Sequence, residues 1–231
     1  MRILIIIPAY NEEGNIERVV NHLIQNYPQF DYVVVNDGSK DSTAEICKRN
    51  KYNLLNQPIN LGLAGAFQTG MKYACQMGYD AAIQFDGDGQ HRPEYIAEMA
   101  QKIEDGNDIV IGSRFVTEEK PSSLRMLGSN IIEGLIKFTT GKVIKDPTSG
   151  MRMFNQKMIK LLAENLNMGP EPDTVAYLVK CGAKVEEIQV KMDERIAGES
   201  YLNLSRSAKY MLTMSISILL VSFFRKKNVL E

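Results

Sequence analysis

The sequence predicts an α/β domain with a mostly parallel central sheet, helices on both faces and an amphipathic helix at the C-terminus. The first observation is that short apolar, β-branched runs alternate with stretches of helical spacing through the first half of the chain. The second is that 231 residues, 44% hydrophobic and 24% charged, suit one larger globular domain and exclude collagen-like or wholly disordered chains.

The predicted strands are short and end in polar or glycine-rich turns, which is typical of a buried parallel sheet. They cover residues 3–7, 32–35, 81–85 and 108–111, with a later strand at 185–190. Helical spacing with plausible helix starts, such as Pro93 in a first turn, covers residues 15–26, 42–50, 63–77 and 93–104. The polar clusters after these strands should converge on one crevice, because ligands of such sheets bind beyond the carboxyl ends of the strands.

The second half of the chain is less regular. Residues 121–140 predict a loop that leads into a helix, residues 145–150 a turn-rich loop, and residues 169–173 carry two prolines. A net charge of −1 excludes a protein that coats nucleic acid by charge alone. Three widely spaced cysteines without a CxxC pair indicate reduced cytosolic thiols and exclude a disulfide framework: Cys47, Cys75 and Cys181.

Residues 206–231 differ from the rest in composition. They carry five bases against one acid, a net charge of +4, so the other 205 residues carry −5. Within them, residues 210–224 are uncharged, and as a helix these 15 residues would reach about 22 Å, short of the roughly 30 Å of a bilayer core. We therefore expect a main domain, 1–205, and a tail, 206–231, that lies on a membrane surface or packs on the domain or a partner subunit.

The sharpest local feature is the run Asp86-Gly87-Asp88-Gly89-Gln90-His91, which follows the predicted strand 81–85. Two carboxylates so close together after a strand can face one hard cation, and the glycines let the backbone turn tightly around it. Oxygen ligands suit Mg²⁺ or Mn²⁺, and either ion can hold a diphosphate. The run alone also fits a simple Asp/Gly turn between a strand and a helix.

Three further loops are ambiguous when each is taken alone. Residues 36–43 suit either the binding of a base or ribose hydroxyl or a helix cap. Residues 8–13 are polar, and residues 60–66 are glycine-rich but lack the GxGxxG fingerprint, so a Rossmann dinucleotide site is not expected. The sequence has no GxxxxGK[ST], GxSxG or HExxH motif either.

Taken together, the four loops point to one family. IIPAYNEE, VVNDGSKDST, NLGLAGA and DGDGQHRPE resemble, in order and spacing, the nucleotide half of family 2 glycosyltransferases with the GT-A fold. The branch they resemble most is that of dolichyl-phosphate mannose synthases and polyprenyl-phosphate glycosyltransferases. The resemblance covers about residues 1–200 and continues through Gly112-Ser113-Arg114, Arg125 with Ser129, the run 146–152, and Arg195 with Gly198 and Ser200. It implies a GT-A, Rossmann-like catalytic domain.

The resemblance also implies roles for the matching residues. The donor's nucleotide and sugar would be bound by Pro8, Tyr10, Glu12, Asp37, Gly65, Asp86, Arg195 and Ser200, with Arg195 as the diphosphate clamp. The metal would be bound by Asp86, Asp88 and Gln90. The acceptor phosphate would face Arg114, Arg125 and Ser129, next to the acceptor-side loop that contains Asp146. The expected catalytic residues are Asp88, Arg114, Arg125 and Asp146.

The chain departs from its relatives in two places. They often have Ser-Lys where this chain has Ser200-Tyr201, and close relatives carry transmembrane helices after the catalytic domain, where this chain has the short tail.

The expected function is therefore that of a metal-dependent, inverting glycosyltransferase on the cytosolic membrane face, peripherally bound. It would move a hexose, with UDP-glucose as the expected nucleotide-sugar donor, to a polyprenyl phosphate, and a homo-oligomer is one open option. A polyprenyl phosphate needs no strong base, because its second pKa is about 6. One alternative is transfer to a hydroxyl of a lipid-linked glycan or protein, where Asp146 or Asp173 would take the proton. Alternatives from other classes are a sugar nucleotidyltransferase and an inactive nucleotide-sugar-binding module.

Overall fold

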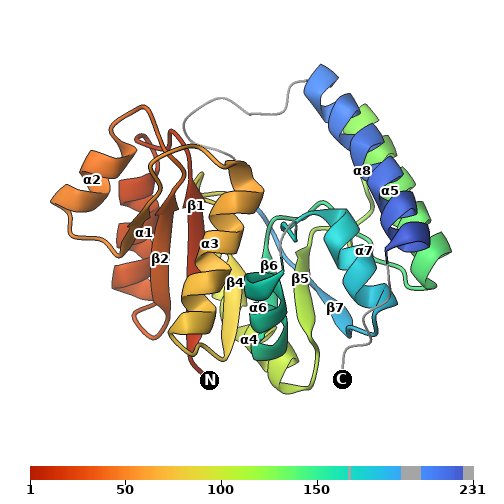
Figure 1. Ribbon diagram of the computed structural model, residues 1–231, viewed down its shortest axis with the longest axis horizontal. Coiled ribbons are helices and arrows are strands. Elements are labelled where there is room, and N and C mark those ends of the chain that lie inside the picture. Colours follow the sequence, from red (N-terminus) through yellow and green to blue (C-terminus); the bar gives the residue numbers. More distant parts are fainter. Residues whose placement is uncertain (166–167, 194–203, 226–231) are drawn as a thin grey trace.

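The computed structural model describes residues 1–165, 168–193 and 204–225, leaving out the side chains of residues 124–125 and 204–206 (Figure 1). The strands are β1 (Ile3–Ala9), β2 (Asp31–Asn36), β3 (Leu54–Asn56), β4 (Ala81–Gln84), β5 (Ile109–Ser113), β6 (Arg152–Asn155) and β7 (Val185–Gln189). The helices are α1 (Ile16–Asn26), α2 (Thr43–Arg49), α3 (Gly62–Gln76), α4 (Ile96–Glu104, entered through the 3-10 turn Pro93–Tyr95), α5 (Leu124–Thr140), α6 (Gln156–Glu164), α7 (Pro172–Lys180) and α8 (Leu204–Phe224).

All seven strands belong to one sheet of order β3-β2-β1-β4-β6-β5-β7. Among these described strands only β6 is antiparallel to its neighbours, β4 and β5. Strand β1 lies between β2 and β4, so the winding of the chain reverses at β1. This is the place where a parallel sheet opens a crevice beyond the carboxyl ends of its strands. The predicted mostly parallel α/β architecture is confirmed.

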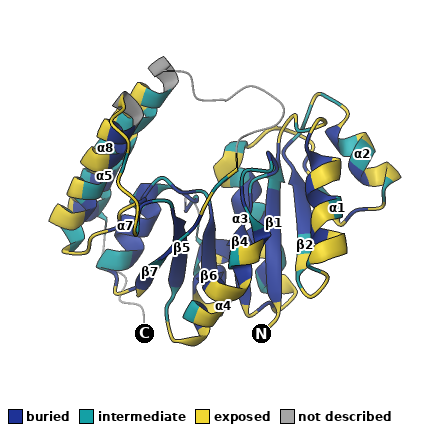
Figure 2. Cartoon of the chain, turned by 180° about the vertical axis from the view of Figure 1, so that it is seen from behind, coloured by how far each residue is buried: buried dark blue, intermediate teal, exposed yellow. Residues whose placement is uncertain are grey.

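The side chains of β1 alternate between two cores, because successive residues of a strand point to opposite faces. Leu4 and Ile6 pack in the core under α3, α6 and α7, whereas Ile3, Ile5 and Ile7 pack in the core under α1 and α4. Figures 1 and 2 show these helix layers from the two sides. Both faces of β1 are therefore covered, which explains why its sequence is continuously apolar.

The structure adds β6 and the helices α6 and α7, which the sequence pattern does not predict. Strand β6 has only four residues and begins at Arg152, whose charge interrupts the apolar pattern expected of a buried strand. Its pairing with β4 and β5 is antiparallel and joins segments that are distant in sequence. Such non-local pairing leaves no local sequence signal.

Helix α8 begins at Leu204, before the uncharged stretch, and its 21 residues extend about 31 Å. Its segment Ser207–Phe224 is long and apolar enough to cross a membrane by length and composition. The argument that this helix is too short to span is therefore wrong. In the structure α8 lies along α5 and α7, and Ile218 is buried against them (Figure 1). The division of the chain at residue 205 stays a prediction.

The side of α8 that faces α7 makes polar contacts. Tyr210 donates a hydrogen bond from its hydroxyl to Oε2 of Glu171, and burial raises the pKa of Tyr210, with the nearby Glu171 charge raising it further. The Ser217 hydroxyl donates to Asp173, and Lys180 of α7 donates to the carbonyl oxygen of Ser222. These contacts fix α8 to the domain along most of its length.

The opposite side of α8 exposes large apolar side chains, and the neighbouring helix α5 does the same (Figure 2). We call this the α5–α8 surface and define it by Leu127, Ile131, Phe138, Leu212, Ile216, Leu220, Phe223 and Phe224. Only 11% of the Ser207–Phe224 segment is buried, which distinguishes α8 from a core helix of a soluble domain. An exposed apolar face of this extent is typical of a membrane or protein contact.

Candidate active site

The loop after β4, residues 86–91, is folded around its own side chains, and we call it the metal loop after the ion that the sequence predicts for it. The backbone N–H of Asp86 donates to Nδ1 of His91 over 3.0 Å, and Nε2 of His91 lies 3.6 Å from Oδ2 of Asp86. Oδ1 of Asp88 accepts from the backbone N–H of Gln90 over 3.0 Å. His91 is buried, so it acts as an internal brace of the loop and not as a surface residue.

The donor set of the metal loop fits a hard divalent ion. Asp86 and Asp88 supply carboxylate oxygens from one turn, and Gln84 donates from Nε2 to Oδ1 of Asp86 over 3.1 Å, which orients that carboxylate. The described residues contain no cluster of three or more His, Cys, Asp or Glu side chains that could hold a metal ion. An ion held by two carboxylates and the Gln90 amide would complete its shell with ligand oxygens, as Mg²⁺ commonly does with substrate phosphates.

The predicted nucleotide loops meet at the carboxyl ends of β1 and β2. Glu12 donates from its backbone N–H to Thr43 Oγ1 over 2.9 Å, and Asn11 donates likewise to Ser39 Oγ over 3.0 Å. Pro8 is partly buried at the end of β1, and Tyr10 is 39% exposed beside it. A Cβ added at Gly87 would lie 3.2 Å from the Pro8 carbonyl oxygen, so the metal loop borders the end of β1.

Asp37 joins two of these loops. Its Oδ1 accepts from the backbone N–H of Leu61 over 2.7 Å, at the start of α3, where Gly65 lies on the first turn. Gly38 has φ +64°, and a Cβ there would lie 2.6 Å from the Ile59 carbonyl carbon, so glycine is required for this approach. The structure thus brings together the predicted donor residues Pro8, Tyr10, Glu12, Asp37 and Gly65.

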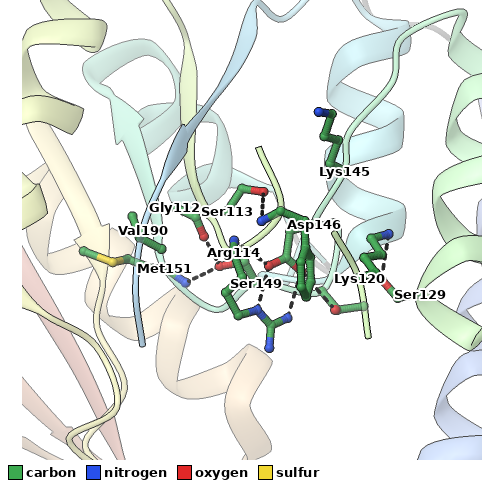
Figure 3. A network of polar contacts seen from close by, with 12 residues as sticks. Gly112, Ser113, Arg114, Lys120, Ser129, Lys145, Asp146, Ser149, Met151 and Val190 are labelled. Atoms are coloured by element: carbon green, nitrogen blue, oxygen red, sulfur yellow. Dashed lines mark hydrogen bonds and ion pairs between the residues drawn. The ribbon is translucent and has the colours of Figure 1, made fainter. Parts of the chain in front are cut away.

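On the acceptor side, Arg114 and Asp146 form a close ion pair (Figure 3). Arg114 donates from Nε to Oδ2 over 2.8 Å and from Nη2 to Oδ1 over 2.9 Å, and Asp146 is fully buried. Glu187 in turn accepts from the backbone N–H groups of Lys145 and Asp146. Asp146 therefore orients Arg114, and Nη1 of Arg114 takes no part in the pair.

The acceptor-side loop, residues 145–150, also touches the metal loop. A Cβ added at Gly150 would lie 2.7 Å from Oδ2 of Asp86 and 3.3 Å from Cε1 of His91. On its other side the loop is tied to β5, because Ser149 Oγ donates to the Gly112 carbonyl oxygen over 2.5 Å (Figure 3). The two halves of the predicted site are therefore in direct contact.

Arg152, the first residue of β6, is buried, with 1% of its surface exposed. Its Nη2 donates to the Pro147 carbonyl oxygen over 2.6 Å and its Nη1 to the Pro170 carbonyl oxygen, so neither acceptor is a carboxylate. Burial lowers the pKa of Arg152, and the charges of Glu171, Asp146 and Asp86 counteract this. In the sequence Arg152 is only the last residue of the run 146–152; the structure shows that its buried positive charge contacts the acceptor-side loop at Pro147.

Of the remaining predicted site residues, the structure describes Ser129 but not the side chains of Arg125, Arg195 and Ser200. Ser129 is fully buried on α5, beneath Lys120, a residue that the sequence analysis did not single out. The side chain of Arg125 lies outside the described part of the structure, as do Arg195 and Ser200. Asp193, the last described residue before the stretch 194–203, pairs with Arg92 and donates from its backbone N–H to the Gln90 carbonyl oxygen.

The two carboxylates considered as general bases are already engaged. Asp146 accepts both hydrogen bonds from Arg114, and Asp173 accepts from the Ser217 hydroxyl of α8 and from the Thr174 backbone N–H. Because both carboxylates are engaged, the arrangement favours an acceptor group that can react without first losing a proton to a base.

The chain is similar to several known proteins in sequence and in fold. The profile described as Glycosyl transferase family 2 matches residues 4–162. UDP-N-acetylglucosamine–dolichyl-phosphate N-acetylglucosaminyltransferase of Methanococcus voltae is 38% identical over 71% of this chain and 73% of its own length. Polyprenol monophosphomannose synthase of Mycolicibacterium smegmatis is 26% identical over 93% of this chain and 86% of its own. Glucosyl-3-phosphoglycerate synthase of Mycobacterium tuberculosis, solved with Mn²⁺, UDP and phosphoglyceric acid, has a similar fold, with a TM-score of 0.71 at 14% identity over 97% and 80% of the two chains.

Proposed function

Because the chain belongs to glycosyl transferase family 2 and is a glycosyltransferase, we propose that it transfers a sugar from a UDP-sugar to a polyprenyl phosphate on the cytosolic face of a membrane. The names of the M. voltae and M. smegmatis relatives, which act on dolichyl and polyprenol phosphates, support this acceptor class.

One observation carries the proposal: the acceptor-side loop, which binds Arg114 through Asp146, also touches the metal loop. Asp146 fixes the Arg114 guanidinium, and Gly150 of the same loop lies against Asp86. Arginine's planar fork suits a phosphate, because it bonds two oxygens at once. An acceptor phosphate at Arg114, with Arg125 as the proposed second contact, would lie beside the carboxylates proposed to hold the donor diphosphate.

In the proposed reaction the protein mainly has to position the donor diphosphate and the acceptor phosphate, and it need not transfer a proton. A divalent ion, Mg²⁺ or Mn²⁺, at Asp86, Asp88 and Gln90 would offset the charge of the leaving nucleoside diphosphate. The acceptor phosphate is largely ionised near pH 7, since its second pKa is about 6, so it can attack without a general base. Attack from the face opposite the diphosphate inverts the anomeric carbon. The engaged state of Asp146 and Asp173 fits this route better than a hydroxyl acceptor.

The other classes fit the chain less well. A sugar nucleotidyltransferase would carry a glycine- and base-rich loop after the first strand, whereas β1 is followed by Tyr10, Asn11 and the two acids Glu12 and Glu13. An inactive binding module has no need for two acids in one turn, the first of them, Asp86, held by Gln84 and His91.

The sugar is open to direct assay. UDP-glucose is the donor expected from the sequence, and UDP-N-acetylglucosamine is the donor in the name of the M. voltae relative. The test incubates the full chain and Mn²⁺ with UDP-glucose, UDP-N-acetylglucosamine or GDP-mannose and a polyprenyl phosphate, and identifies the product by mass. We expect a product with one of the two UDP-sugars; product only with GDP-mannose would refute the UDP assignment.

Membrane association is proposed to occur through the α5–α8 surface. Its apolar side chains are exposed on both helices, and the tail adds basic residues that anionic headgroups attract. Deleting the tail is a poor test, because it would also uncover the apolar residues of α5 and α7 that α8 covers. Substitutions on the exposed side keep the packed side intact.

We expect the triple variant Leu212→Ser, Ile216→Ser, Leu220→Ser to bind anionic liposomes at least about ten-fold more weakly, because it removes exposed apolar area from the contact. Liposome co-sedimentation measures this. The matched control is Ile24→Ser with Met77→Ser, which changes exposed apolar residues elsewhere on the domain and should leave binding unchanged. Unaltered liposome binding together with dissociation of a dimer would assign the surface to a second copy of the chain.

A further inference from the structure

We propose that Lys120 is a phosphate-binding residue of the acceptor site. In the present arrangement its ammonium group is paired with Glu133 instead. This inference rests on the proposed function and adds a residue to it. Lys120 lies in the loop between β5 and α5, and the family motifs quoted above do not include it.

The contacts of Lys120 place its ammonium group at the predicted acceptor side (Figure 3). Nζ lies 2.7 Å from Oε2 of Glu133 and 3.4 Å from Oγ of Ser129. It also lies 5.7 Å from the ring centre of Phe115, and the Arg114 guanidinium carbon lies 5.1 Å from the centre of the same ring. Both cations thus contact the same aromatic ring, that of Phe115.

The burial of Ser129 explains why Lys120 matters. Ser129 is 0% exposed, so its hydroxyl is not open to an incoming phosphate in this arrangement. The Lys120 side chain is 13% exposed, and its Nζ lies 3.4 Å from the Ser129 hydroxyl oxygen, so of these two groups it is the lysine that reaches the surface. A phosphate that approaches this part of α5 meets the lysine ammonium before it meets the serine hydroxyl.

The partner of Lys120 makes an exchange possible. Lysine is a compact charge on a flexible four-carbon stem with three donors, so its ammonium can turn from one anion to another. A phosphate monoester brings close to two negative charges near pH 7, against one on Glu133. Arg114 cannot make the same exchange easily, because Asp146 holds it by two bonds and is fully buried. Lys120 is thus the cation that can change its partner, whereas Arg114 stays bound to Asp146.

Two substitutions should have opposite effects. Lys120→Met removes the ammonium and should weaken binding of citronellyl phosphate, a soluble prenyl phosphate, by about ten- to a hundred-fold. Glu133→Gln removes the competing carboxylate and should leave binding as tight as in the wild type or tighter. Calorimetric titration of the full chain measures both, and Lys120→Arg, which keeps the charge, should retain most of the affinity.

The control is Lys142→Met, which removes the same charge from an exposed site beyond the end of α5 and should change binding by less than about two-fold. If Lys120→Met and Glu133→Gln both weaken binding, or if Lys120→Met binds like the wild type, the inference is overturned and the pair only anchors the loop. A wild-type chain that neither binds citronellyl phosphate nor transfers sugar to a polyprenyl phosphate would instead overturn the proposed function, and this inference with it.

Discussion

Asp88→Asn is expected to abolish sugar transfer almost completely while the fold stays intact. Asp88 is 5% exposed in the metal loop, and its Oδ1 accepts from the Gln90 backbone N–H, a bond that an asparagine oxygen can keep. The substitution removes one anionic ligand from the proposed ion site. The loss should exceed the roughly 10- to 100-fold that changes in outer-shell partners cause.

Two measurements separate this effect from misfolding. Titration with Mn²⁺, followed by the spin-resonance signal of the free ion, should show weaker binding in the variant, and thermal unfolding should be little changed. Asp105→Asn, an exposed acid at the end of α4, is the matched control and should behave like the wild type. EDTA should abolish wild-type transfer and added Mn²⁺ should restore it. Full activity of the wild type in EDTA would refute the metal assignment.

Asp146→Ala is expected to destabilise the protein by about 3–5 kcal/mol and to remove transfer as well. Asp146 is fully buried and accepts from Nε, Nη2 and the backbone N–H of Arg114. Without the carboxylate the guanidinium loses its partner in a poorly solvated place, and it no longer points in a fixed direction. Asp146→Asn keeps the shape and an acceptor oxygen and should have an intermediate effect.

The matched control for Asp146→Ala is Glu17→Ala. Glu17 pairs with Arg49 at 3.4 Å, but the two side chains are 48% and 67% exposed, so its loss should cost less than about 1 kcal/mol. Urea unfolding of the three variants gives the comparison. If Asp146→Ala were as stable as Glu17→Ala, the ion pair between Asp146 and Arg114 would not stabilise the fold, and the expectation would be wrong.

The parts of the fold that could be predicted are those with local signals. Strand β1 is a continuous apolar run because both of its faces are buried, and α4 begins after Pro93, which fits only a first turn. Strand β6 could not be predicted, since its pairing depends on segments far apart in sequence and its first residue is a buried arginine. The uncharged stretch 210–224 predicts a shorter helix than α8, because bases such as Lys209 border the stretch but lie inside the helix.

The same division holds for the site. The run from Asp86 to His91 carries its own turn chemistry, so its place after a strand and its acids are readable from the sequence. The engagement of Asp146 by Arg114, the contact of Lys120 with Ser129, and the contact of Gly150 with Asp86 are tertiary contacts between separate segments. The first two depend on side-chain directions that sequence spacing does not define.

The most direct test of the proposed function compares two acceptors that differ by one group. The full chain with Mn²⁺ and its UDP-sugar is given a polyprenyl phosphate or the matching polyprenol, and the lipid product is identified by mass. We expect one sugar on the polyprenyl phosphate, none on the polyprenol, and release of UDP. Transfer to the polyprenol but not to the phosphate would contradict the account, because it would require a base that neither Asp146 nor Asp173 provides in this arrangement.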